Sequence, residues 1–415
     1  MRLPRRQFLK LAGSGLLLPH ARASMASSQH RFRIRTITAG MELDKIDNPR
    51  RIHGVIDLLG RLRAAYQDKG YTVQTLRLAT QSLAGYLPDW MQASSISELK
   101  KLDLIMQETG VLLSVGPLPI DAGNSLELGS WASKMIGATS RTVFSINVAS
   151  ADAGIHAASI RSAVEVIAAL SRVGSAGLSN FRFTASACVP PGTPFFPAAY
   201  HEGEDAFSIG LETPNLLTDT FTEADDIREA KALLRTDLQN ALEPIEELGV
   251  RLARENGLKY GGIDVSPAPG PEASIGRAVE TLTGNPFGSA STLAACSAIT
   301  DVLKSLRVKK CGFSGLMLPV IEDSVLAARA TENRYGISEL LLYSSVCGTG
   351  LDVVPLPGDV SRRKLAGILR DVAALALKYN KPLSARIMPI PGKKAGHAVT
   401  FSHPLLHDSV VFAPD

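Results

Sequence analysis

The stretch TVFSINVAS (residues 142–150) is followed by IHAASIRSAVEVIAALSRVG (155–174) and then by NFRFTASACV (180–189). The first and third segments are short apolar runs of strand length, whereas the middle one carries apolar residues at helical spacing. A strand, a helix and a second strand in this order predict a parallel pair, because parallel strands need a crossover connection. This part of the sequence therefore indicates an α/β fold.

The same alternation continues outward in both directions. Further strands are expected at 31–40, 71–80, 111–120, 207–213, 260–266, 313–319, 351–357 and 383–390. Helices are expected at 49–70, 96–110 and about 223–256, around Ile275 and Ala298, from Glu322, and through Asp371. No long low-complexity linker interrupts the pattern, so residues 31–415 are predicted to form a single domain. A division near Asn256 into two half-domains is the alternative.

The N-terminus has the features of an export signal. MRLPRRQFLKLAGSGLLLPHARA (residues 1–23) contains paired Arg5 and Arg6, a short apolar run and a small-residue ARA end, which indicate a twin-arginine leader. Pro4 stands where such leaders usually carry Ser or Thr, and an uncleaved membrane anchor or a chance basic start is the alternative. The apolar run is too short to span a bilayer, which takes about 20 residues. We therefore predict a periplasmic or otherwise exported protein that engages the twin-arginine machinery, with residues 24–30 as a tether.

The charge of the chain depends on that leader. The formal net charge is +4, but five of the 44 basic residues lie in residues 1–23, which leaves 39 basic against 40 acidic residues. The mature chain is therefore close to neutral and gives no reason to expect nucleic acid or an anionic membrane as partner. No stable membrane span is expected after cleavage.

The four cysteines are Cys188, Cys296, Cys311 and Cys347, and no two of them form a CxxC pair. That spacing argues against a zinc ribbon or a thioredoxin-type motif. His403 and His407 are four residues apart, but Pro404 between them makes a helix doubtful, so no metal site is predicted. The sequence identifies no cofactor.

Two residues stand out as candidates for chemistry. Cys347 lies in SSVCGTGLDVVPLPGD (344–359) among glycines, where it serves either as a reactive thiol beside a basic group or as a tight-loop cysteine. Asp264 ends an apolar strand just before SPAPG (266–270), where it acts as an acid–base group or ligand, or equally caps the next helix. Ser266 follows it as a candidate substrate contact.

Basic and acidic loop residues supply candidate binding groups. Lys393 and Lys394 lie between glycines, with His397 close behind, and two ammonium groups there suit an anionic substrate; a solvated basic loop is the alternative. His201 and Glu202 follow aromatic residues in FFPAAYHEGED (195–205) and are candidate pocket residues. They form no zincin motif, because no second histidine follows four residues later.

Glu322 and Asp323 open a helix after Pro319, where acidic residues suit the helix dipole. We interpret this pair as structural unless it faces the site.

Gly- and Pro-rich polar clusters follow three of the expected strands, at 147–154, 264–272 and 391–397. In barrels and doubly wound sheets, ligands bind where loops leave the carboxyl ends of strands. These clusters therefore favour one shared site at that end of the fold, although loops of this composition are also needed simply to turn the chain.

Five strings together resemble the family called domain of unknown function 711. They are IRTITAGMEL (34–43), SINVASADAGIH (145–156), GGIDVSPAPGP (261–271), VCGTGLDVVPLPGD (346–359) and ARIMPIPGKKAGH (385–397). The resemblance implies a fold like the glycyl-radical enzymes: a ten-stranded α/β barrel of two parallel five-stranded halves with helices outside. By that analogy the Cys347 loop and the loop at 392–396 converge inside the barrel.

The chain departs from glycyl-radical enzymes in one decisive way, because it has no Arg-Val-x-Gly-Tyr motif near its C-terminus. We therefore reject radical chemistry. The export leader also departs from the family, whose members we expect mostly in the cytoplasm.

We predict a non-radical enzyme, a hydrolase, lyase or isomerase, that acts on a small anionic molecule in the barrel interior. Cys347 is the expected nucleophile or acid–base group, Asp264 and Asp352 are the expected carboxylates, and Lys393 with Lys394 binds the anion. The alternative is a non-catalytic periplasmic binding or scaffold protein, which needs only a concave pocket and hydrogen-bond donors.

Overall fold

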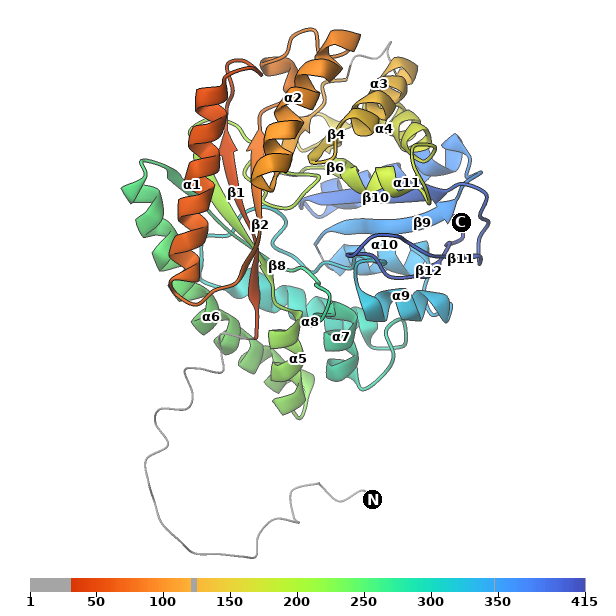
Figure 1. The fold of residues 1–415 in the computed structure, drawn as a ribbon. Helices are drawn as coiled ribbons and strands as arrows, with labels where there is room; N and C mark the ends of the chain where they lie inside the picture. The colour runs from red at the N-terminus through yellow and green to blue at the C-terminus, as the bar shows by residue number, and fades with distance from the viewer. Residues whose placement is uncertain (1–30, 121–124, 347, 415) are drawn as a thin grey trace, which may run out of the picture.

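A mixed β-sheet lies at the centre of the fold (Figure 1), in a computed structural model that describes residues 31–120, 125–346 and 348–414. The strands are β1 (Arg33–Met41), β2 (Val73–Thr80), β3 (Val111–Pro117), β4 (Thr142–Ser150), β5 (Gly154–Ile155), β6 (Phe183–Ala187), β7 (Ala206–Glu212), β8 (Lys259–Pro267), β9 (Gly350–Pro357), β10 (Leu383–Ile390), β11 (Ala398–Val399) and β12 (Ser409–Val410). The prediction of an α/β fold is confirmed.

The order of the large sheet is β8-β7-β1-β2-β3-β4-β6-β10-β9, with β5 paired to β4 as its tenth strand. Strands β1, β2, β3, β4 and β6 run parallel. The β1–β7 and β6–β10 pairs are antiparallel, whereas β7–β8 and β10–β9 are again parallel. The prediction of two parallel half-sheets is therefore wrong, because the strands form one mixed sheet.

The sheet has two end strands, β8 and β9, and no ladder of described residues joins them. Isolated bridges link Ile263 to Lys310 and Pro319 to Asp352. The strand expected at 313–319 does not form, because Gly312 (φ 60°) and Ser314 (φ 43°) take left-handed backbone conformations that interrupt an extended chain.

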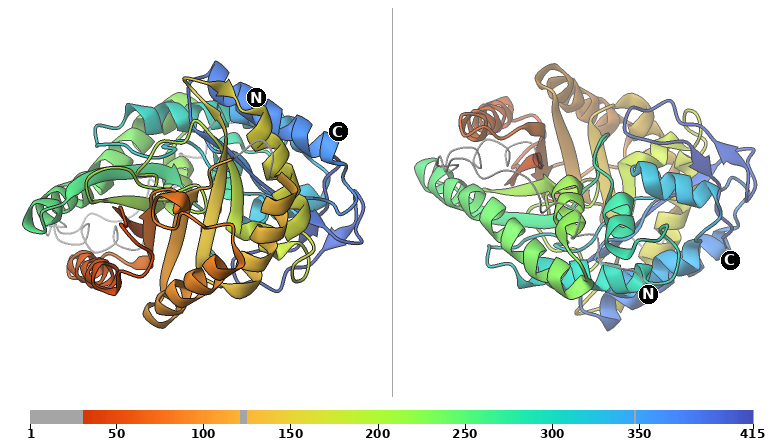
Figure 2. Two further views of the ribbon diagram at one scale, coloured as in Figure 1. Left: turned by 90° about the horizontal axis from the view of Figure 1, so that it is seen from above. Right: turned by 90° about the horizontal axis from the view of Figure 1, so that it is seen from below.

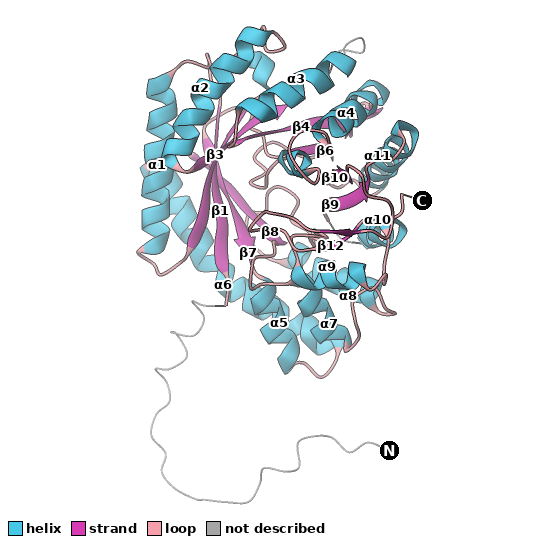
Figure 3. Ribbon diagram, turned by 45° about the vertical axis from the view of Figure 1, so that its right-hand side comes forward, coloured by secondary structure: helices cyan, strands magenta, loops and turns pink. Residues whose placement is uncertain are grey.

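Helices lie on the outer side of the strands in every view (Figure 2 and Figure 3). They are α1 (Pro49–Gln67), α2 (Ala93–Thr109), α3 (Ser125–Ala138), α4 (Ala157–Leu170), α5 (Pro214–Glu223), α6 (Ile227–Glu255), α7 (Ile275–Thr283), α8 (Thr292–Ser305), α9 (Ser324–Thr331), α10 (Ile337–Val346) and α11 (Arg362–Lys378), with the short 3₁₀ turns η3 (Leu83–Gly85) and η4 (Leu178–Arg182). Most follow the sequence signals for helix ends: Asn48 caps α1 ahead of Pro49, and Gly110 ends α2 in a left-handed conformation.

The buried aspartate Asp323 ties two helices together. It is the N-cap of α9, where it accepts hydrogen bonds from Val325 N and Leu326 N at 3.0 Å each. The same carboxylate accepts from Ile275 N (2.6 Å) and the Ser274 hydroxyl (2.7 Å) at the start of α7. It therefore stabilises two helix N-termini at once and leaves its neighbour Glu322 to face elsewhere.

Two apolar clusters fill the fold. The larger runs along the chain from Phe32 to Phe412 and packs the helices against the strands. The smaller, which we call the apolar wall, is separate from it and consists of Val189, Phe195, Ala198, Ala268, Phe313 and Met317. Its members come from loops rather than from strands, and all but Val189 line the cavity described next.

Candidate functional site

A cavity of about 770 Å³ lies among the strands, in the size range of small-molecule sites. Six arginines line it: Arg33, Arg35, Arg77, Arg141, Arg182 and Arg386. The only acidic residues among its described lining residues are Glu322 and Asp352, and His403 is the histidine. Six cationic side chains therefore face two carboxylates in the lining, and Glu212 beside Arg33 and Arg35 offsets part of that excess.

Strand alternation aims the arginines into the cavity. In β1, Arg33 and Arg35 line the cavity while Ile34 between them is completely buried. Because successive side chains of a strand point to opposite faces, Ile34 packs outward and the arginines point inward. Arg77 in β2 lies between the buried Leu76 and Leu78, and Arg386 in β10 between the buried Ala385 and Ile387. Both arginines line the cavity in the same way.

Arg386 forms the centre of an ion-pair network. Its Nε donates to Asp352 Oδ1 at 2.6 Å, and its Nη2 donates to Glu322. Glu322 also lies 3.8 Å from Arg35, which contacts Glu212 at the same distance. Burial alone would lower the pKa of Arg386, but the charges of Asp352 and Glu322 raise it. Glu322 thus faces the cavity, so the structural interpretation of this residue from sequence is incomplete.

Arg77 lies beside this ion-pair network but is not part of it. Its side chain is only 7 % exposed and forms no ion pair with any carboxylate in the described ranges. Nη1 donates a long 3.3 Å hydrogen bond to Pro194 O, and the ring of Phe196 lies 5.0 Å from Cζ. Nε is buried without a hydrogen-bond partner. Burial, followed by repulsion from Arg35, lowers the pKa of Arg77 to about 9, so the guanidinium stays charged at neutral pH.

Arg182 lines the same cavity but is fully engaged with the backbone. Its Nε donates to Thr142 O at 2.8 Å, and Nη1 donates to Thr139 O at 2.7 Å and to Ile136 O at 3.1 Å. These carbonyls belong to the end of α3 and the start of β4. Arg182 therefore holds the fold together, whereas Arg77 has donors to spare.

Thr349, Phe181 and His403 also line the cavity. The Thr349 hydroxyl is buried without a partner and lies on the cavity. The Phe181 ring lies 4.8 Å from Arg386 Cζ, and its centroid lies 5.0 Å from that of the His403 ring at a tilt of 59°. Burial lowers the pKa of His403, which favours a neutral imidazole at pH 7. Nδ1 of that ring accepts from Leu405 N at 3.3 Å, which leaves the neutral ring's proton on Nε2.

The residues predicted from sequence are scattered around this cavity. Asp352 lines it. Asp264 and Ser266 do not: the Asp264 carboxylate accepts from Phe313 N (2.8 Å), Ser314 N (2.9 Å) and the Ser266 hydroxyl (2.6 Å). Burial raises the pKa of Asp264 to about 6 against these hydrogen bonds. Gly312 leaves room for it, since a Cβ there would lie 2.2 Å from Asp264 Oδ2.

The other predicted binding residues lie away from the cavity. Lys393, Lys394 and His397 are exposed in the turn between β10 and β11, so the expected convergence of this loop inside the fold does not occur. His201 is buried against Gly40, with Nε2 3.1 Å from Gly203 O, and Glu202 is exposed. Their roles in binding stay predictions, as does that of Cys347, which lies outside the described residues.

One of the three loop clusters that were expected to share a site lies on the cavity. Of the three loop clusters, only 264–272 contributes to the cavity, through Ala268, Pro269 and Pro271. Strand residues such as Arg35, Arg77 and Arg386 and loop residues such as Phe195, Phe313 and His403 build the rest of the wall. β7 and β8 run antiparallel to β1, so their carboxyl ends lie beside the start of β1. Sequence reasoning missed Arg35, Arg77 and Arg386. The signal at Arg77 and Arg386 is an arginine flanked by apolar residues in an expected strand, whereas Arg35 shows only strand alternation.

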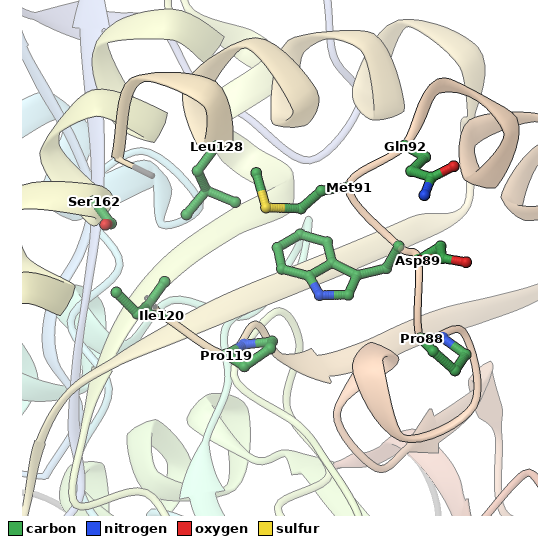
Figure 4. Close-up of a pocket in the computed structure, with 9 residues that line it drawn as sticks. Pro88, Asp89, Met91, Gln92, Pro119, Ile120, Leu128 and Ser162 are labelled. Atoms are coloured by element: carbon green, nitrogen blue, oxygen red, sulfur yellow. The ribbon is translucent and has the colours of Figure 1, made fainter. Parts of the chain in front are cut away.

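A second hollow of about 400 Å³ lies beside α3 and α4 and is mostly apolar. Figure 4 shows Met91 and Leu128 close together there, with Asp89 turned away from them. It carries no cluster of charged groups among its described lining residues: Pro88, Asp89, Trp90, Met91, Gln92, Pro119, Ile120, Leu128 and Ser162.

In the described ranges, no group of three His, Cys, Asp or Glu side chains is placed to hold a metal ion. Nor does any helix of that part have the length and apolar character needed to cross a membrane.

The fold and the cavity define an α/β protein with a large mixed sheet and an arginine-rich cavity. The sequence profile described as Uncharacterised ACR (DUF711) matches residues 25–402, so the chain belongs to that family. The chain is 30 % identical to a UPF0210 protein of Pyrobaculum aerophilum, over 79 % of this chain and 75 % of the relative. It is 28 % identical to a UPF0210 protein of Desulforudis audaxviator, over 89 % and 88 % of the two chains. The predicted family resemblance is confirmed.

Proposed function

We propose that the arginine-rich cavity binds a small organic anion. The observation that carries this proposal is the charged side chain of Arg77, which is buried in the cavity wall without a carboxylate partner. Burying an unpaired charge is costly, and proteins normally pair such a group. An anion that enters the cavity supplies the missing partner, while the apolar wall receives the rest of the molecule.

Thermal unfolding tests this proposal. Small organic anions are added to the protein, and their neutral amides serve as controls of the same shape. A ligand present at 100 times its Kd stabilises the native state by about 2.7 kcal/mol. We expect the anions to raise the Tm and the amides to leave it unchanged. Equal shifts with both sets, or none with either, would contradict the proposal.

A second candidate function is acid–base catalysis on the bound anion, by a hydrolase, lyase or isomerase. The neutral His403 ring supports it, because this ring lies in the same cavity as Asp352 and Glu322. Such catalysis needs a titratable side chain within hydrogen-bond reach of the proton that is moved. Isotope exchange into a bound anion in D₂O, followed by NMR, tests this function, and a His403→Gln variant should abolish the exchange. Exchange that persists in that variant would remove His403 from the mechanism. Non-catalytic binding remains the alternative.

We propose that residues 308–320 close the sheet into a barrel around the cavity. Hydrogen bonds from Cys311 N to Ile263 O (3.1 Å) and from Val320 N to Asp352 O (3.0 Å) support this closure at the two end strands. Slow hydrogen exchange of both amides, at the rate of neighbouring β8 amides, is expected. Fast exchange of either would argue for an open sheet.

We also propose that residues 1–23 direct export by the twin-arginine route and that residues 31–415 fold as one domain. The paired Arg5 and Arg6 support export, and the continuous main core supports one domain. N-terminal sequencing of the periplasmic protein should find cleavage after Ala23. Periplasmic accumulation of a variant with both arginines changed to lysine would argue against this route.

A further inference from the structure

We propose that the anion is a carboxylate with an apolar body, and that its carboxylate docks against the Nε–Nη2 edge of Arg77. This inference rests on the proposed anion-binding function and names the chemical class of the ligand. Three features of the cavity carry it: the edge of Arg77 that is left unpaired, the carboxylates around its neighbours, and the apolar wall.

The guanidinium of Arg77 presents one free edge. One of its nitrogens, Nη1, is used by Pro194 O, and the ring of Phe196 lies against the group. Nε is unpartnered but has almost no accessible surface, so a ligand reaches it only when the guanidinium turns toward the cavity. Nη2 donates to no described residue. The N–H groups on these two nitrogens are parallel, and their spacing matches that of the two oxygens of a carboxylate. A lysine at this position would supply charge without that fork.

Two of the neighbouring arginines, Arg35 and Arg386, are already occupied. Arg386 is bound by Asp352 and Glu322, and Arg35 lies 3.8 Å from both Glu212 and Glu322. A phosphate dianion needs more donors than one guanidinium edge supplies, and Glu322 and Asp352 already offset the charges of the two arginines beside Arg77. A carboxylate needs one edge and brings one negative charge, so the charge pattern favours it over a phosphate.

The apolar wall accounts for the rest of the ligand. Phe195, Ala198, Ala268, Phe313 and Met317 line the cavity as one cluster that is separate from the main core. Apolar side chains that border an internal cavity gain free energy when an apolar group fills it. A volume of about 770 Å³ accommodates a body far larger than a carboxylate alone.

The experiment compares probes of matched shape by calorimetry in low-chloride buffer. The probes are phenylacetate and hexanoate as carboxylates, phenyl phosphate as a phosphate, and phenylacetamide as a neutral isostere. We expect the two carboxylates to bind at least tenfold more tightly than phenyl phosphate and phenylacetamide. Arg77→Lys should weaken carboxylate binding at least tenfold, and Arg77→Met should abolish it. The exposed Arg307→Lys is the matched control and should change nothing.

The outcomes separate this inference from the function on which it rests. Preferential binding of phenyl phosphate would overturn the carboxylate assignment and leave anion binding intact. Binding of both carboxylates that is unchanged in Arg77→Lys would overturn the assignment to the Nε–Nη2 edge. The absence of binding by all three anions would overturn both proposals.

Discussion

Replacing Arg77 by methionine should stabilise the ligand-free protein, which is the opposite of what most substitutions of a buried residue do. Methionine is unbranched and of similar length, so it fills the same space without a charge. Replacing buried ionic groups by well-packed apolar ones is often neutral or stabilising.

The magnitude follows from the surroundings of Arg77. Burial and two neighbouring arginines lower its pKa from 12.5 to about 9. Each pKa unit corresponds to 1.36 kcal/mol, so the charge is disfavoured by about 5 kcal/mol relative to the neutral form. The variant loses the hydrogen bond to Pro194 O, worth about 1.5 kcal/mol for a charged donor. It also loses the stacking on Phe196, worth about 2 kcal/mol. A net gain of roughly 1–2 kcal/mol remains.

Urea unfolding in low-chloride buffer measures the change in the free energy of unfolding. Thermal unfolding gives a second measure. A chain of this size has an unfolding entropy of about 0.8 kcal/mol/K, so a gain of roughly 1–2 kcal/mol should raise the Tm by about 2 °C. Arg182→Met is the control from the same cavity. It should lower stability by about 3 kcal/mol, because it removes a side chain whose donors are paired with Ile136, Thr139 and Thr142 carbonyls. A loss of more than 1 kcal/mol in Arg77→Met would show that Arg77 is structural and would refute the reasoning.

Four further predictions concern other residues. Asp323→Ala should cost about 3 kcal/mol in urea unfolding, because two helix N-termini lose their acceptor; a change below 1 kcal/mol would contradict the double cap. The carboxylate of Asp264 has a pKa raised to about 6, so its contribution to stability is present below pH 3.8 and is lost as the pH rises through 6, by up to about 3 kcal/mol; Asp264→Asn should flatten that part of the profile, and an unchanged pH slope would count against it. Thr349→Val should leave unfolding of the ligand-free protein within 0.5 kcal/mol, as expected for a hydroxyl without a partner, and a larger loss would reveal one. If Cys347 is a nucleophile, it should react with a thiol reagent at pH 7 faster than free cysteine does, and a Cys347→Ser variant should lose any activity found; an equal rate or a fully active variant would end that role.

Much of the fold was predictable from local patterns. The helical spacing at 49–70 and 155–174 and the short apolar runs between helices identify most of the elements to within a few residues. These patterns report short-range physics: backbone geometry, capping and the burial of one face. The prediction of a strand at 313–319 was wrong, because left-handed backbone conformations at Gly312 and Ser314 override the strand-like composition of this segment. That conformation makes room for hydrogen bonds to Asp264, a residue about fifty positions away.

The candidate site was predictable only in part. Asp352 was identified and does line the cavity, whereas Lys393 and Lys394 are exposed. An ammonium group beside a glycine looks the same in sequence whether its loop turns inward or outward. Arg33 and Arg35 likewise have the alternation of a strand with one solvent-facing side. Only the assembled sheet turns that polar side inward, toward Arg77 and Arg386.

By itself, the sequence of this protein determined the alternation of strands and helices, the family and the near-neutral charge after residue 23, because each depends on neighbours along the chain or on simple counts. Only the tertiary structure decided which charges are paired. Arg77 and Arg386 are each flanked by apolar residues in a strand, but of these two only Arg386 forms ion pairs with Glu322 and Asp352. Whether a buried arginine finds a carboxylate depends on the packing of strands distant in sequence, because the Coulomb interaction depends on separation in space.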